Sequence, residues 1–155
     1  DRWPLSGGLA RAGGTLFIQR GSGDSDQVRQ QITGFLKQKL PILFFPEATT
    51  TDGRQVRRLH GRLLQSAIDS QANIQPVVMC YVTAQRKLDL VIPFIGDISF
   101  VVHLQQVLAH PAVTAHVMVL PVIHSVGHDV HRLTNLLQQQ MRDGLAALHA
   151  KVLVD

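Results

Sequence analysis

The sequence of 155 residues has few of the residues on which several kinds of protein depend. Its one cysteine, Cys80, excludes a framework of disulfides and fits a reducing compartment. Aromatic residues make up 5% of the chain, with one tryptophan and one tyrosine, so there is little to stack on nucleic-acid bases. No apolar run reaches the roughly 18 to 20 residues that span a bilayer.

Apolar residues, by contrast, are plentiful. They make up 45% of the chain against 17% charged residues, which excludes a disordered chain and provides enough apolar surface for the core of one domain. Cys80 lies in the apolar run PVVMCYV, where a buried core residue is expected. The net charge of +4 and the pI near 9.8 favour anionic partners such as phosphates, nucleic acid or an acidic membrane surface.

Apolar spacing predicts strands that alternate with helices. The predicted strands are 14–18, 42–45, 76–82, 89–93 and 116–123, the last interrupted by Pro121. The predicted helices are 25–39, one whose apolar face runs from Val56 to Ile68, 102–109 and 129–153. This order is typical of a layered α/β fold with a mostly parallel sheet flanked by helices, here as a single domain over residues 1–155.

Two of the predicted strands end in charged residues. Arg20 follows the strand at 14–18, and Glu47 follows the strand at 42–45. A charge at the end of a buried strand costs free energy unless it is paired or solvated, and ligands of such sheets bind where strands end. Arg20 and Glu47 therefore pair with each other, face a polar ligand, or do both.

A run of cations follows Glu47. Its members are Arg54, Arg57, Arg58, His60 and Arg62, of which Arg57, Arg58 and Arg62 lie off the predicted apolar helix face. The run is either a solvated helix face or a surface that attracts anionic groups, such as lipid phosphate, the phosphates of a donor or an acidic bilayer. No aromatic residue interrupts the run, so nucleic acid is not an expected partner.

Three sequence blocks carry a family resemblance. FPEAT at 45–49 is similar to the FPEGT block of the lysophospholipid acyltransferases, the PlsC-like 1-acylglycerol-3-phosphate acyltransferase family. GTLFIQR at 14–20 resembles the block that precedes it, and IQPV at 74–77 resembles the block that follows. Their order and spacing also agree, with about 27 residues from Arg20 to Glu47 and about 29 from there to Pro76. With weaker similarity on both sides, the resemblance covers nearly the whole chain.

The resemblance implies transfer of a fatty acyl group from acyl-CoA or acyl-carrier protein to the hydroxyl of a lysophospholipid, with lysophosphatidic acid as the usual acceptor. The acyl donor is a co-substrate, and no cofactor is implied. The expected location is the cytoplasmic face of a membrane, held peripherally or by a preceding segment. Two alternatives remain: a relative that acylates another lysolipid, such as lyso-ornithine lipid, and a non-catalytic lipid-phosphate-binding module of the same fold.

The resemblance also assigns residues to this reaction. Those implied in substrate binding are Arg20, Pro46, Glu47, Ala48 and Thr49, and those implied in the acyl-donor region are Pro76 and Val77. Arg20 is expected to hold the substrate phosphate through charge-assisted hydrogen bonds. Glu47 is expected to orient Arg20 or to accept a glycerol hydroxyl, while Thr49 supports the loop. Arg54, Arg57 and Arg58 are the candidates for attracting anions.

One departure from the family pattern concerns Ala48, which stands where the family has glycine. Glycine admits a positive φ and a close approach of ligand to backbone, whereas alanine does so only at a cost. We expect a negative φ at this position, so that alanine is tolerated. A positive φ would mean that the site is altered.

The other departure concerns the general base, which in the family is the histidine of a His-x4-Asp block. Residues 1–13 contain no histidine, so we expect the chain to begin inside the domain, with this block upstream of Asp1 and no activity of the chain alone. His124 and Asp129 match the pattern but follow the FPEAT block; we interpret Asp129 as a helix cap. His124, His128 and His131 complete no recognised metal spacing, so no metal is expected.

Overall fold

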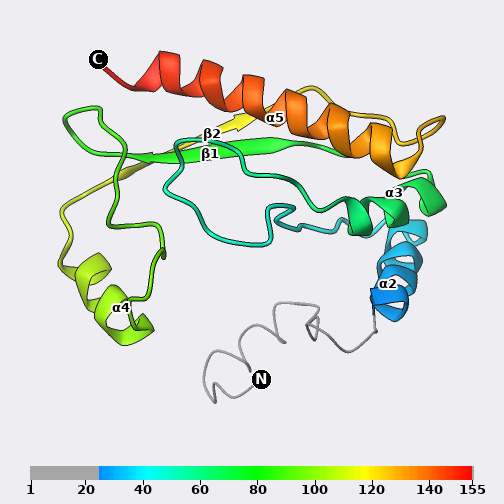
Figure 1. The fold of residues 1–155 in the computed structure, drawn as a ribbon, viewed down its shortest axis with the longest axis horizontal. Coiled ribbons are helices and arrows are strands. Elements are labelled where there is room, and N and C mark those ends of the chain that lie inside the picture. The colour runs from blue at the N-terminus through cyan, green and yellow to red at the C-terminus, as the bar shows by residue number, and fades with distance from the viewer. Residues whose placement is uncertain (1–24, 155) are drawn as a thin grey trace.

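The computed structural model describes residues 25–154, and the helix formed by Val130–Val152 runs along its long axis (Figure 1). The elements in chain order are α2 (Ser25–Lys37), the 3₁₀ helix η1 (Gly61–Leu63), α3 (Leu64–Ser70), β1 (Val77–Val82), α4 (Phe100–Ala109), β2 (Thr114–Val119) and α5 (Val130–Val152). The predicted strand at 14–18 and Arg20 lie outside the described residues.

The core lies between α5 and one face of the two-stranded sheet. The buried side chains of α5 recur at helical spacing: Leu133, Leu137, Met141, Leu145, Leu148 and Val152. They pack with Val78, Cys80 and Val82, which alternate along β1 on the same face of the sheet. Cys80 is 2% exposed, so the prediction of a core residue is confirmed, and burial raises the pKa of its thiol.

The other helices near this core are α2 and α3. Val28 and Ile32 are buried on α2, which packs against α3. Arg29 on α2 forms an ion pair with Asp69 at 3.0 Å, and the hydroxyl of Ser66 donates a hydrogen bond to the carbonyl of Arg29 at 3.2 Å. Because α3 also contacts α5, these interactions attach α2 to the core.

The direction of β1 and β2 differs from the prediction. Both strands were expected, and β2 ends at Val119, just before Pro121. They pair antiparallel, with Val82 opposite Thr114, so a parallel arrangement is wrong for this pair. A parallel pair needs a crossover element that returns the chain to the starting end of the sheet. The segment with α4 instead returns the chain to the end of β1 from which it left.

Two other predicted strands are absent as strands. Residues 42–45 alternate as a strand would, with Leu43 and Phe45 84% and 74% exposed, but within residues 25–154 the segment pairs with no other strand. Residues 89–93 form a turn instead, because the Asp89 carboxylate accepts hydrogen bonds from the N–H groups of Val91 and Ile92. These bonds take the place of a strand ladder.

The predicted helix after the FPEAT block begins later than expected. Val56 and Leu59 are buried as predicted, but residues 54–60 are irregular, and the α-helix begins only at Leu64. The side chain of Gln138 on α5 binds the backbone of this segment at Arg57 and Leu59, which keeps these groups out of helical hydrogen bonds. Arg57 and Arg58 therefore lie on an extended segment and not on a helix face.

The remaining helices are close to the predicted ranges. Asp129 caps α5 by accepting a hydrogen bond from the N–H of Arg132 at 2.8 Å, as expected. Ser99 caps α4 in the same way through the N–H of Val102. None of the described helices combines the length and the apolar character needed to cross a bilayer.

Candidate functional site

The FPEAT block begins a loop that closes on itself. The N–H of His60 donates to the carbonyl of Pro46 at 2.8 Å, which brings the two ends of the loop together. Inside this closure, the N–H of Arg57 donates to Oε2 of Glu47, also at 2.8 Å. The Glu47 side chain is half-buried and is thus held in one place by a backbone group ten residues further along the chain. The second oxygen of a carboxylate fixed in this way can accept further hydrogen bonds, for example from a ligand.

Glu47 stands beside an apolar cavity of about 380 Å³. The cavity is lined by residues 43–47, by residues 74–79 and by the core-facing side chains Leu137, Met141 and Leu145 of α5. Pro46, Pro76 and Val77 are all in this lining, so the structure brings the FPEAT block and the Pro-Val block together at one site. Its composition, mostly apolar with a few polar groups such as Glu47 and Gln75, suits a ligand with a long hydrocarbon part.

Ala48 has a positive φ. Its value is 55°, in the left-handed region that glycine adopts without cost and alanine does not. The expectation of a negative φ is therefore wrong, because the turn that carries Glu47 requires the conformation for which glycine is suited. The site is thus altered at this position: the alanine keeps the turn, in which the N–H of Ala48 donates to the carbonyl of Phe45 at 3.1 Å, but at an energetic cost.

The other predicted residues of this loop face solvent. Thr49 is exposed and is not among the residues that line the cavity. The side chain of Arg54 is 65% exposed and lies 3.5 Å from the carboxylate of Asp52, while Arg57 and Arg58 are exposed. Exposure fits both a solvated surface and an anion-attracting one, so these two interpretations stay open. Arg20 lies outside the described residues, and its pairing with Glu47 stays a prediction.

Gln138 was missed by sequence reasoning. Its Oε1 accepts from the N–H of Leu59 and its Nε2 donates to the carbonyl of Arg57, both at 2.8 Å. Since the N–H of Arg57 in turn binds Glu47, Gln138 connects α5 to the candidate site. The one signal in the sequence is its position beside Leu137, where a polar side chain borders the apolar seam of the helix.

The second His-x4-Asp pattern is engaged in local structure. Nδ1 of His124 lies 2.9 Å from Oδ1 of Asn73, and Asp129 caps α5. The backbone hydrogen bond from Arg132 lowers the pKa of Asp129 below its ordinary value. Among residues 25–154, no three His, Cys, Asp or Glu side chains gather in a way that could hold a metal ion.

Similarity to known proteins defines the class of this chain. The acyltransferase family matches residues 1–80, just over half of the chain. The chain therefore belongs to the acyltransferase family, and the resemblance to lysophospholipid acyltransferases is confirmed.

Individual relatives are bacterial. The lyso-ornithine lipid O-acyltransferase of Pseudomonas aeruginosa is 41% identical over 140 residues, which are 90% of this chain and 54% of that protein. The protein of the same name from Rhodobacter capsulatus is 32% identical over 69% of this chain and 40% of its own length. The 1-acyl-sn-glycerol-3-phosphate acyltransferase of Neisseria gonorrhoeae is 34% identical over 51% of this chain and 31% of its own length.

The chain thus spans about half the length, or less, of these curated relatives. No solved structure matches it.

Proposed function

We propose that the protein transfers a fatty acyl group to the hydroxyl of a lysolipid. The observation that carries this proposal is the position of Glu47, whose carboxylate is fixed by the Arg57 N–H at the edge of an apolar cavity that Pro76 and Val77 also line. A lysolipid has the matching chemistry, because it combines a polar head with one hydrocarbon chain. Membership of the acyltransferase family supplies the reaction class.

The lysolipid we place first is lyso-ornithine lipid. The relatives of that name resemble 90% and 69% of this chain, whereas similarity to the glycerol-phosphate enzyme covers 51%. Ornithine carries both an ammonium group and a carboxylate. In this proposal Glu47 binds the ammonium group and Arg20 binds the carboxylate. For a glycerol-phosphate acceptor, Arg20 would bind the phosphate and Glu47 a glycerol hydroxyl.

The rest of the mechanism is proposed from the resemblance. The donor is acyl-CoA or acyl-carrier protein, and the general base is a histidine of a His-x4-Asp block outside these 155 residues. The reaction takes place at the cytoplasmic face of a membrane, on a layered domain whose full sheet is mostly parallel. Because His124 contacts Asn73 and Asp129 caps a helix, His124→Asn should leave turnover nearly unchanged.

The test is an acyl-transfer assay with the complete protein, a labelled acyl donor and each of the two lysolipids. Glu47→Gln keeps the shape of the side chain and removes its charge. A charge-assisted hydrogen bond is worth about 1.5 to 3 kcal/mol, so the KM for the lysolipid should rise by about tenfold or more. The KM for the donor should not change.

Asp52→Asn is the matched control, because Asp52 lies in the same loop and its carboxylate contacts Arg54. An unchanged lysolipid KM in Glu47→Gln would remove Glu47 from the site. Lysolipid binding without any transfer would favour the non-catalytic module. Faster transfer to 1-acylglycerol-3-phosphate than to lyso-ornithine lipid would reverse the order of the two acceptors.

A further inference from the structure

The segment between β1 and β2 forms a lobe of its own, defined here as residues 90–109 and called the α4 lobe. Figure 1 shows α4 away from α5 and the sheet. Among the described helices and strands, none packs substantially against α4, and no residue of this helix is buried. The lobe is therefore not part of the hydrophobic core.

The base of the α4 lobe is closed by Asp89 and His110. The Asp89 side chain is buried, and its Oδ2 forms a hydrogen bond with Nε2 of His110. Burial by itself would raise the pKa of Asp89, but hydrogen bonds from Ile92, His110 and Val91 together lower it below its ordinary value. A charged carboxylate thus joins the two ends of the lobe.

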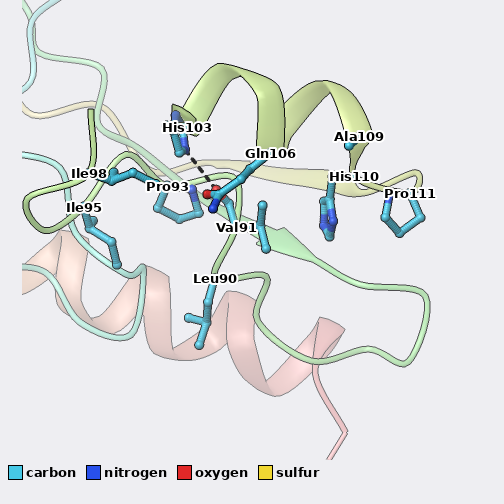
Figure 2. Close-up of a pocket in the computed structure, with 10 residues that line it drawn as sticks. All are labelled: Leu90, Val91, Pro93, Ile95, Ile98, His103, Gln106, Ala109, His110 and Pro111. Carbon is cyan, nitrogen blue, oxygen red and sulfur yellow. Dashed lines mark hydrogen bonds between the residues drawn. The ribbon is translucent and has the colours of Figure 1, made fainter. Parts of the chain in front are cut away.

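The inner side of α4 carries two partly buried histidines, His103 and His110, together with Val107, whereas Gln106 lines the cavity but is exposed. Figure 2 shows His103, Gln106 and His110 beside a cavity whose opposite wall is the segment 90–98. This cavity has a volume of about 480 Å³, and the ring of His103 donates a hydrogen bond across it to the carbonyl of Val91 at 3.0 Å. These residues recur at helical spacing and so define one side of the helix.

The apolar side of α4 faces outward. Val101, Leu104 and Leu108 are 63%, 42% and 77% exposed, and the exposed polar residues of the helix are Gln105 and Gln106. A helix on the surface of a protein in water has the reverse arrangement, with its polar side towards solvent. The orientation of α4 therefore indicates that its outer side meets an apolar environment.

Formal charge is almost absent from this part of the chain. Asp97 is the one residue with a formal charge among the 39 positions from Leu90 to His128. Ordinary composition, about 25% charged residues, would place about ten charges there. Surfaces that bind other proteins surround an apolar centre with a polar rim, whereas a hydrocarbon environment excludes charge altogether. The lack of charge thus favours lipid over a protein or a second copy of the chain.

We propose that the outer side of α4 docks the protein onto a lipid bilayer, where it lies in the interface between headgroups and hydrocarbon. Ten residues of helix measure about 15 Å, half of the hydrocarbon thickness, so α4 can lie in the interface but cannot span it. The choice of lipid as partner rests on the proposed function. Docking at α4 would hold the lysolipid site close to the membrane that contains its substrate.

The first test places a polarity-sensitive dye on the outer side of α4. Cys80 is 2% exposed, so a dye reacts selectively with an introduced cysteine. Leu108→Cys reports on α4, and Leu136→Cys, at a 43% exposed position of α5, is the control. On neutral phosphatidylcholine vesicles the emission of the dye at position 108 should shift to the blue, while that at 136 should not. No shift at 108, or equal shifts at both positions, would overturn the proposal.

The second test measures flotation with the same vesicles. Val101→Asp/Leu108→Asp should lower the partition coefficient by about tenfold or more, because two apolar anchors become charged. The control is Val126→Asp/Leu136→Asp, which alters one exposed valine and one exposed leucine elsewhere. Circular dichroism and thermal unfolding establish that both pairs of variants fold. Equal flotation of the α4 variant and the wild type would overturn the proposal.

Self-association is the competing outcome. Dissociation of a dimer by Val101→Asp/Leu108→Asp, with no vesicle binding by the wild type, would show that a second copy covers α4 and would overturn the proposal. Neither test contains a lysolipid or an acyl donor. A failure of vesicle docking is therefore distinct from a failure of acyl transfer, which the assay with Glu47→Gln measures separately.

Discussion

At the scale of single residues, Ala48 shows how one side chain can oppose the backbone it occupies. Its φ of 55° costs an alanine free energy that a glycine does not lose. The strained residue directly follows Glu47, so the strain lies within the candidate site. This position is the one departure from the FPEGT pattern that the structure can evaluate.

Ala48→Gly should therefore stabilise the protein by up to about 1 kcal/mol. The substitution removes the cost of the left-handed conformation, and the greater conformational freedom of glycine in the unfolded chain offsets part of this gain. Ala147→Gly, at an exposed position inside α5, should destabilise it by about 1 kcal/mol, since that alanine has helical dihedral angles. Urea unfolding of both variants measures the opposite signs. If Ala48→Gly destabilised the protein as much as Ala147→Gly does, the conclusion that Ala48 is strained would be contradicted.

At the scale of the elements, the segment 54–60 depends on a different part of the chain for its conformation. The amide of Gln138 binds it at two backbone groups, as a neighbouring strand would. The same segment supplies the N–H that holds Glu47. A side chain of α5 thereby determines the shape of a loop about 80 residues earlier in the sequence.

Gln138→Met keeps the length of the side chain and removes both hydrogen bonds. It should destabilise the protein by about 1 to 3 kcal/mol, because the N–H of Leu59 loses its partner in a partly buried place and the exposed carbonyl of Arg57 loses a second hydrogen bond. Gln139→Met, beside it on the exposed side of α5, should stay within about 0.5 kcal/mol of the wild type. Amide hydrogen exchange at Leu59 should accelerate in the first variant alone; equal exchange in both would contradict the role of Gln138.

Sequence reasoning about elements succeeded where a segment interacts mainly with itself. The helix predicted at 129–153 is α5, because its seam and its cap at Asp129 are encoded within a few turns. The α-helix predicted after residue 53 begins only at Leu64, because the side chain of Gln138 forms hydrogen bonds with backbone groups that a helix would use. The strand predicted at 42–45 has the right alternation, but a strand also requires a neighbour, and no segment among residues 25–154 pairs with it.

At the scale of the whole molecule, charge and apolar surface are separated along the chain. Arg54, Arg57 and Arg58 lie in the loop of the candidate site, whereas the α4 lobe has a single formal charge. The net charge of +4 adds a general attraction to anionic lipids. Docking on a bilayer would then combine a salt-independent contribution from α4 with a salt-dependent one from the arginines.

On vesicles with phosphatidylglycerol, Arg57→Ala/Arg58→Ala should therefore weaken binding. Each basic residue near an anionic surface is worth about 1 kcal/mol, so the partition coefficient should fall by about thirtyfold at low salt. The difference should largely vanish at about 0.5 M salt, where the charges are screened. Arg132→Ala/Arg142→Ala removes the same charge from α5 and should have a much smaller effect. Equal losses in both pairs would leave Arg57 and Arg58 as an ordinary solvated surface.

The sequence by itself determined the reaction family, the position of Glu47 at the end of an apolar segment, the capped helix α5 and the buried Cys80. These depend on motifs and on periodicity, which are local properties of the chain. Only the tertiary structure decided the positive φ of Ala48, the antiparallel direction of β1 and β2, the role of Gln138 and the outward apolar side of α4. Each of these depends on which distant segment provides a hydrogen bond or a packing surface, and such pairings are settled only when the whole chain folds.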